Sequence, residues 1–392
     1  MRVVFAAIPG YGHLYPLMPL AMACAAAGHV VTVAVGEPFL GRLPLPTVPG
    51  IRTGAELDGV VQETRRRHPD ARGHELTVAM FGDTTAEFVS SALDEAVEDL
   101  RPDLVVYEAM NVGAAMAADV HDIPAAGFAI GMAPFVVEKI HGAAREFRRT
   151  FWAARGRVPP LGSALLGAAL IDPAPPSLVS TDAGPSSTGA SPAALSPIPR
   201  LPIRSVAYSE NSSAVPDWLS GKRSRPAIYL TLGTVSFGAV EVIRRAVDQL
   251  AGLDVDVLVA VGPEGEPEAL GDLPGHVHVE RFVPQSEVLD LVDLIVHHGG
   301  TGTVLGAMAA GLPQLILPQG ADQFFNADLV ARTGAGRSLL NEGQLDGAIV
   351  RAASAMLGDC PERTRADQLR LEIAGMPAPE QLVPELVRLA GR

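Results

Sequence analysis

The chain has 392 residues, of which 48% are hydrophobic and 19% charged, and this composition suits two or more globular domains and excludes wholesale disorder. Its 30 Lys and Arg are outnumbered by 44 Asp and Glu, and the net charge of −14 argues against a nucleic-acid-binding protein. Two isolated cysteines, Cys24 and Cys360, exclude a disulfide framework and a thiolate zinc site. Since signal-peptide and membrane-length apolar patterns are missing, we expect a soluble cytoplasmic protein.

Strand-like apolar runs alternate with helical stretches through the first half of the chain. We expect strands at 3–8, 29–35, 103–108 and 124–130, and helices at 17–27, 84–100 and 114–120. The segment 52–74 is polar and of low periodicity, so no element is predicted there. Strands that alternate with helices of crossover length predict a parallel sheet covered on both faces.

The character of the sequence changes between 172 and 216, where Pro, Ser and Gly are frequent and no period is sustained. This stretch is interpreted as a loop and interdomain connection. Alternation then resumes, with strands expected at 227–233, 255–261, 276–282, 291–298 and 314–318 and helices at 239–250 and 303–310. The second half is therefore predicted to be a second α/β domain.

The first glycine-rich loop, PGYGHLYPLMPLA, follows the first expected strand and leads into a helix. Gly10 and Gly12 supply the start of a dinucleotide-binding fingerprint, but Tyr15 occupies its third glycine position. A large ring there would block the close approach of helix and strand that the third glycine permits. The loop is either a degraded Rossmann loop or one with another use, with His13 placed where a phosphate would lie.

The densest pattern is VHHGGTGTVLGAMAAGLPQLILPQGADQ, at 296–323. A strand ends in His297 and His298, and the glycine-rich run 299–303 opens a helix. Backbone N–H groups and the partial positive charge of a helix N-terminus favour an anion there. No Lys follows the glycines, so this is not a Walker loop. A diphosphate site is favoured over a glycine-rich turn with two structural histidines.

Together these motifs resemble a known family. RFVPQSEVL (281–289), HHGGTGT and GLPQLILPQGADQ resemble the nucleotide-sugar signature of inverting GT-B glycosyltransferases, with the bacterial branch that glycosylates macrolides, aromatic polyketides and enediynes as the nearest likeness. PGYGHLYPLMPLA resembles the family's N-terminal G-x-G-H-x-x-P element, and PPSL, VPDWL and LTLGT resemble further landmarks. The resemblance implies two Rossmann-like, doubly wound parallel-sheet domains facing a central cleft. Residues 1–210 would bind acceptor, 211–376 would bind nucleotide sugar, and 377–392 would form a helix returning toward the N-terminal domain.

The resemblance assigns His13 as the general base that takes a proton from the acceptor hydroxyl. Imidazole titrates near neutrality, and the positive end of a helix favours its neutral form. The family places a supporting acid where this chain has Glu108, and many relatives carry Asp there. The alternatives are a structural histidine and an ordinary acid at the end of a strand.

The resemblance also implies a donor site. His298 would contact a phosphate, the run from Gly299 to Thr303 would complete the diphosphate site, and Thr234 would face the diphosphate and sugar. Asp322 and Gln323 would bind sugar hydroxyls, although Asp322 could equally cap a helix. The full set implied in nucleotide-sugar binding is Gly12, Thr234, Phe282, Val283, Gln285, His298, Gly299, Gly300, Thr301, Gly302, Thr303, Asp322 and Gln323.

Gly306 indicates the donor base. UDP-sugar enzymes of plants carry a glutamate at this position, which holds both ribose hydroxyls, and its absence favours thymidine diphosphate (TDP) over UDP. The alternative is that Gly306 only relieves helix crowding.

An apolar acceptor wall is expected from Phe81, Met110, Met132 and Phe135, each of which could instead be core. The resemblance implies metal-independent, inverting transfer of a (deoxy)sugar from a TDP-sugar to a hydrophobic natural product, without a cofactor or a bound metal. The alternatives are a UDP-sugar enzyme of the same fold, a nucleotide-sugar epimerase, or a non-catalytic glycosyltransferase helper. The sugar, the aglycone, the linkage and the choice between monomer and homodimer stay open.

Overall fold

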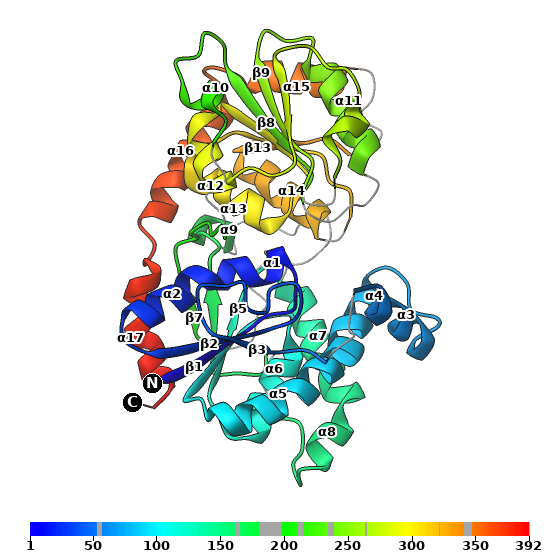
Figure 1. The fold of residues 1–392 in the computed structure, drawn as a ribbon, viewed down its shortest axis with the longest axis vertical. Coiled ribbons are helices and arrows are strands. Elements are labelled where there is room, and N and C mark those ends of the chain that lie inside the picture. The colour runs from blue at the N-terminus through cyan, green and yellow to red at the C-terminus, as the bar shows by residue number, and fades with distance from the viewer. Residues whose placement is uncertain are drawn as a thin grey trace. The chain divides into compact units, whose positions relative to one another are not determined.

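The structure is a computed structural model (Figure 1). It describes residues 1–52, 57–132, 134–160, 165–179, 198–210, 215–233, 239–262, 265–320, 322–340 and 347–391. The chain divides into two compact units. The first comprises Met1–Pro173, Pro192–Arg204 and Pro377–Arg392, and the second comprises Ala174–Ser191 and Ser205–Met376. The first unit is therefore assembled from three separate stretches of the chain.

The first unit is built on a seven-stranded sheet of order β3-β2-β1-β4-β5-β6-β7 with parallel pairings throughout. Its central strands are rich in Val and Ala and buried on both faces, as parallel sheets require. The strands are β1 (Arg2–Ala6), β2 (Val30–Val35), β3 (Thr47–Pro49), β4 (Leu104–Glu108), β5 (Ala125–Phe128), β6 (Ala169–Asp172) and β7 (Arg200–Pro202).

Helices cover both faces of this sheet (Figure 1). Helix α5 (Ala86–Leu100) buries positions 86, 89, 90, 93 and 97, a helical stripe that packs with α6 (Val112–Val120) against Val4 and Ala6 of β1. Helix α17 (Pro379–Leu389) packs on α2 (Met18–Ala26). The other helical segments are α1 (Tyr11–Leu14), η1 (Tyr15–Leu17), α3 (Leu57–Arg67), α4 (His74–Ala79), the π-helical η2 (Met80–Thr85), α7 (Pro134–Phe147) and α8 (Arg149–Ala153).

The second unit has a six-stranded parallel sheet of order β10-β9-β8-β11-β12-β13. Its strands are β8 (Ala227–Thr231), β9 (Asp256–Ala260), β10 (Val277–Glu280), β11 (Leu294–His297), β12 (Gln314–Ile316) and β13 (Gly336–Ser338). Its helical segments are α9 (Pro176–Val179), α10 (Asp217–Ser220), α11 (Ala239–Leu250), η3 (Pro267–Leu270), α12 (Gln285–Val288), η4 (Leu289–Leu291), α13 (Thr301–Ala310), α14 (Gln323–Thr333), α15 (Ala348–Met356) and α16 (Pro361–Ala374). The prediction of two α/β domains with parallel sheets is confirmed.

Two sequence predictions were wrong in detail. The segment 52–74 contains α3. The last turn of this helix carries three arginines, and Glu63 forms ion pairs with Arg66 and Arg67. The supposed connection 172–216 contains α9 and the edge strand β7, which pairs with β6 over only three residues. Helix α3 is held by ion pairs and β7 by pairing with β6, and neither has the sustained apolar period that was sought.

No helix in the described ranges combines the length and the apolar character needed to cross a membrane.

Candidate active site

The candidate catalytic residues lie at the point where the strand order of the first sheet reverses. From β1 the chain moves outward to β2 and β3, and it then returns to place β4 on the other side of β1. Ligands of open α/β sheets bind at the carboxyl ends of the strands at such a switch point. His13 lies in α1, which follows the short loop after β1, and Glu108 is the last residue of β4. The topology therefore brings the two residues together.

His13 and Glu108 are in direct contact. His13 Nδ1 lies 3.0 Å from Glu108 Oε1, and the Glu108 side chain is fully buried while that of His13 is 25% exposed. The second carboxylate oxygen, Oε2, accepts a hydrogen bond of 2.9 Å from the backbone N–H of Met110. A buried carboxylate is costly unless its oxygens are paired, and both oxygens of Glu108 are.

The His13 ring is fixed on two further sides. A Cβ at Gly10 would lie 3.2 Å from His13 Cδ2, so the backbone approaches the imidazole more closely than most residues would permit. The ring of Phe81 lies 5.9 Å from the His13 ring, centroid to centroid. At Gly12, by contrast, a Cβ would meet nothing within 4 Å, so protein packing does not require a glycine there.

Two of the four residues predicted for an acceptor wall, Phe81 and Met110, lie beside this pair. Phe81 contacts the His13 ring, and Met110 follows Glu108 and donates its N–H to the carboxylate. Both side chains are half-buried against the core of the first unit. Met132 is buried in the loop after β5. The side chain of Phe135 lies outside the described residues.

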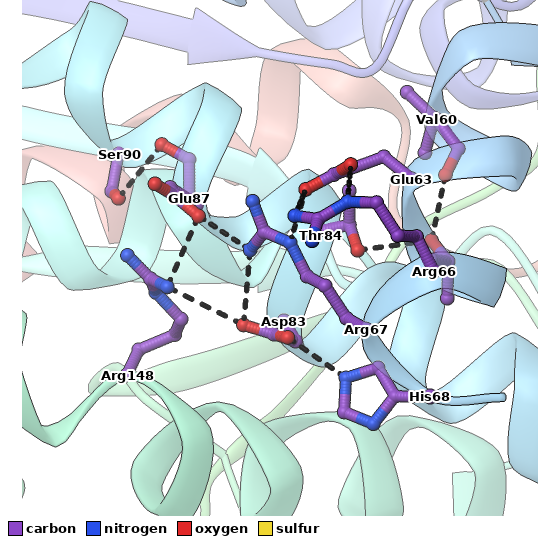
Figure 2. Close-up of polar contacts among 11 residues, drawn as sticks. Val60, Glu63, Arg66, Arg67, His68, Asp83, Thr84, Glu87, Ser90 and Arg148 are labelled. Carbon is purple, nitrogen blue, oxygen red and sulfur yellow. Dashed lines mark hydrogen bonds and ion pairs between the residues drawn. The ribbon is translucent and has the colours of Figure 1, made fainter.

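Phe81 stands in a π-helical turn that is held by a network of charged side chains (Figure 2). Asp83, two residues later, accepts hydrogen bonds from His68 Nε2 at 2.8 Å and Arg148 Nη1 at 3.4 Å. Arg148 also donates to Glu87 Oε2 at 3.1 Å. Figure 2 shows Arg67, His68 and Arg148 pointing toward Asp83, which belongs to η2, and π-helical turns are frequent at functional sites.

In the second unit, His297 and His298 have different environments. His297 is fully buried; its Nδ1 accepts the N–H of Gly299 at 3.1 Å and its Nε2 donates to Gln314 Oε1 at 3.0 Å. Burial lowers the pKa of His297 to about 3, so the imidazole is neutral. Gly299 has φ of 94° and its N–H is occupied by His297, so His297 shapes the turn and the backbone N–H of Gly299 is not offered to a ligand.

His298 is enclosed by glycines. A Cβ at Gly233 would lie 2.6 Å from His298 Cε1, and a Cβ at Gly300 would lie 2.4 Å from Nε2, so both positions leave room for the ring only as glycine. Burial lowers the pKa of His298 to about 4, and Nδ1 is a buried nitrogen with no hydrogen-bond partner. A buried polar atom without a partner is unusual, and this nitrogen stands out for that reason, although the ring also bonds the backbone of Thr231.

Helix α13 begins beside His298 with an uncapped N-terminus. Gly300, its N-cap residue, supplies no side-chain hydrogen bond to the first turn. The hydroxyl groups of that turn face neighbouring side chains: Thr301 Oγ1 bonds Asp322 Oδ2 at 3.1 Å, and Thr303 Oγ1 bonds Gln285 Oε1 at 3.4 Å. The first-turn N–H groups of a helix have no partner within the helix, so this terminus can bind an anion.

The remaining predicted donor residues are placed as follows. Asp322 stands at the N-cap of α14 but makes no capping bond, so its carboxylate serves Thr301 instead. Gln323 is buried, and its Oε1 accepts N–H groups of Gln319 at 2.8 Å and Gly320 at 3.1 Å. Val283 is buried and Phe282 is exposed. Thr234 lies outside the described residues.

Gly306 is crowded. A Cβ there would lie 3.1 Å from Leu289 Cδ1 and 3.4 Å from Gln285 Nε2. Relief of helix crowding is therefore a physical reason for this glycine, beside any effect on the nucleotide.

Two buried residues in these sites were missed from the sequence. The Nδ2 of Asn326 bonds Gly299 O at 2.8 Å, Thr301 Oγ1 at 3.0 Å and Asp322 Oδ2 at 3.0 Å, so it ties α14 to the start of α13. His141 bonds the backbone beside Glu108. Neither residue lies in a motif. In the described part of the chain, no group of three or more His, Cys, Asp or Glu is arranged to hold a metal ion.

Comparison with known sequences gives a family for the whole chain. Residues 20–233 match the N-terminal domain, and residues 244–389 the C-terminal domain, of a family described as erythromycin biosynthesis protein CIII-like. The chain is 33% identical to L-demethylnoviosyl transferase of Streptomyces niveus, covering 97% of this chain and 96% of the relative. It is 31% identical to 10-deoxymethynolide desosaminyltransferase of Streptomyces venezuelae, covering 100% and 98%.

A solved structure is similar over the same length. Spinosyn rhamnosyltransferase SpnG, complexed with thymidine diphosphate, matches with a TM-score of 0.80 at 26% identity, covering 99% of this chain and 100% of that chain. The match over both units confirms the fold predicted from the sequence.

Proposed function

The chain belongs to the erythromycin biosynthesis protein CIII-like family of natural-product glycosyltransferases with the GT-B fold, and from this we propose that it transfers a deoxysugar from a TDP-sugar to a small-molecule aglycone with inversion. His13 is the general base of this proposal and Glu108 its partner. The observation that carries it is the contact of 3.0 Å between His13 Nδ1 and Glu108 Oε1 at the switch point of the first sheet.

Glu108 has two functions in this mechanism. By accepting the Nδ1 proton it selects the tautomer of His13 that leaves a lone pair on Nε2, and it stabilises the imidazolium that forms as the acceptor hydroxyl is deprotonated. Burial of Glu108 removes competing water from this contact. The glutamate in place of the commoner aspartate is compatible with the pairing, since the contact has ordinary hydrogen-bond length.

The leaving diphosphate is assigned to the start of α13. Developing negative charge on the leaving group would be stabilised by the first-turn N–H groups around Gly302 and by the imidazole of His298. His298 would act as a neutral hydrogen-bond donor, because its pKa of about 4 keeps the imidazole uncharged near neutral pH. The hydroxyl of Thr303 and the carboxylate of Asp322 frame the same turn.

Two observations support a TDP-linked donor. The similar solved structure of SpnG is a complex with thymidine diphosphate, and position 306 of this chain has no carboxylate to hold a ribose 2′-hydroxyl. The name of the Streptomyces venezuelae relative, 10-deoxymethynolide desosaminyltransferase, supports a small-molecule acceptor. In this chain Phe81 and Met110 would present apolar surface to such an acceptor beside the base.

A thermal-shift panel with TDP, UDP, GDP and NAD tests the donor. A ligand present at about a hundred times its dissociation constant stabilises the native state by roughly 2.7 kcal/mol. We expect TDP to raise the unfolding temperature most, and a larger shift with UDP would contradict the donor preference. Inversion is tested by assigning the anomeric configuration of donor and product by NMR; an unchanged configuration at the anomeric carbon would refute a single displacement.

A further inference from the structure

His141 is a fully buried histidine in the middle of α7 that belongs to no sequence motif. Both of its ring nitrogens bond backbone atoms of other segments. Nε2 lies 2.8 Å from the carbonyl oxygen of Ala109, and Nδ1 lies 2.9 Å from the backbone nitrogen of Leu166. The imidazole therefore joins two loops that are far apart in the sequence.

The two contacts determine the state of the ring. The Leu166 N–H can only donate, so Nδ1 accepts and carries no proton; Nε2 then carries the proton and donates to Ala109 O. Burial lowers the pKa of His141 to about 4, so this neutral tautomer persists at physiological pH.

Ala109 belongs to the turn that presents the partner of the proposed base. The turn starts at Glu108, whose carbonyl accepts the N–H of Asn111 at 2.8 Å, and the Glu108 carboxylate accepts the N–H of Met110 at 2.9 Å. These two bonds are internal to the turn. From outside it, the N–H of Ala109 donates to Phe128 O at 2.8 Å, and its carbonyl accepts from His141.

Within the described residues, Asn111 adds no side-chain hydrogen bond to this turn. Asn111 occupies the N-cap of α6, and its side chain makes no capping bond. Both Nδ2 and Oδ1 of this buried amide are without a hydrogen-bond partner. The orientation of the Ala109 carbonyl group therefore depends on its hydrogen bond from His141 Nε2.

We propose that His141 is a positioning residue for sugar transfer, which holds the Ala109 carbonyl so that the Glu108 carboxylate and the Met110 N–H keep the geometry that orients His13. The inference rests on the proposed function of His13 and Glu108. His141 itself touches neither the base nor a substrate; it acts through the backbone of the turn.

Two substitutions separate the two bonds of His141. In His141→Gln the side-chain Nε2 takes the place of the imidazole Nε2 and can still donate to Ala109 O. In His141→Asn the side-chain Oδ1 takes the place of Nδ1, so the bond from Leu166 N–H survives while the bond to Ala109 is lost. Both variants lose the ring and disturb the same core, which makes each the control for the other.

The experiment compares kcat, acceptor KM and the TDP-induced thermal shift of the two variants at a temperature where both are folded. We expect His141→Asn to lose kcat by about 10- to 100-fold, the usual cost of a small misplacement of a catalytic group. His141→Gln should retain most of the wild-type kcat, and the TDP shift should be unchanged in both.

Equal loss of kcat in the two variants, in proportion to their loss of stability, would overturn the role of His141 and show it to be a core residue. Glu108→Gln measured in parallel distinguishes this from failure of the proposed function. A wild-type kcat in Glu108→Gln would refute the proposed roles of His13 and Glu108. A lowered kcat in Glu108→Gln, together with an equal loss of kcat in the two His141 variants, would refute the inference about His141 alone.

Discussion

Gly302 offers a substitution with opposite expected effects on stability and on ligand binding. It is the second residue of α13, it is exposed, and a Cβ there would meet nothing within 4 Å. A glycine in a helix costs about 0.5–1 kcal/mol relative to alanine, so Gly302→Ala should stabilise the free protein by at most that amount. For a unit of this size the unfolding temperature should rise by roughly 1–4 °C.

The same methyl group should weaken TDP binding. If the diphosphate lies on the first-turn N–H groups of α13, the added Cβ separates them from the phosphate oxygens. Losing one hydrogen bond to a charged group costs about 1.5–3 kcal/mol, which corresponds to roughly a 10- to 150-fold lower affinity. The protein packing around Gly302 does not require a glycine, so the substitution tests the diphosphate without disturbing the core.

Gly300, two residues earlier, provides the contrast. A Cβ at this position would lie 2.4 Å from Nε2 of the buried His298 ring, so Gly300→Ala must displace the imidazole. It should destabilise the free protein by about 1–3 kcal/mol, as overpacking does, and also weaken TDP binding. Gly275→Ala serves as the control, because a Cβ there also meets nothing within 4 Å and the residue lies in the turn before β10.

The assay is calorimetric unfolding of the three variants without ligand, followed by titration with TDP. Gly302→Ala should be at least as stable as wild type and bind TDP more weakly, while Gly275→Ala should bind TDP normally. Unchanged TDP affinity in Gly302→Ala would refute the placement of the diphosphate on α13, and destabilisation of its free form would refute the packing argument.

Two further outcomes are expected. Asp83→Asn should raise the acceptor KM and destabilise the protein by about 1–3 kcal/mol, because it weakens the hydrogen bonds that hold the turn of Phe81. An unchanged acceptor KM in steady-state kinetics would contradict a role of this turn in acceptor binding. The free energy of unfolding should fall as the pH drops from 6.5 toward about 4, because His141, His297 and His298 take up protons only when the protein unfolds. Urea denaturation that gives the same free energy of unfolding at pH 7 and at pH 5 would contradict the buried neutral state of these histidines.

Much of the fold was predictable because the central strands are distinctive. Strands β1, β4 and β8 are runs of Val, Ile, Leu and Tyr buried on both faces, and such runs stand out in a sequence. The edge strands β3, β7 and β13 have three residues each, too few to show a period. Helix α3 was missed because it is rich in charged residues and is tied to its neighbours by ion pairs such as that of Arg67 with Glu87.

The candidate site was predictable where a motif carried it. The pairing of His13 with Glu108, 95 residues apart, follows from the resemblance and from the adjacency of β1 and β4. His141 was not predictable, because it bonds a backbone carbonyl 32 positions away and any residue type can supply that carbonyl. Likewise Gly299 was expected to offer its N–H to the diphosphate, and only the structure shows that His297 occupies it.

The most direct test of the base is the rate of sugar transfer by His13→Ala at saturating TDP-sugar and acceptor, with TDP affinity measured on the same preparation. Loss of a general base should lower kcat by about 10²- to 10⁴-fold, and TDP should still bind with wild-type affinity because its site is assigned to the second unit. Transfer by His13→Ala at the wild-type rate would contradict the assignment of His13 as the base.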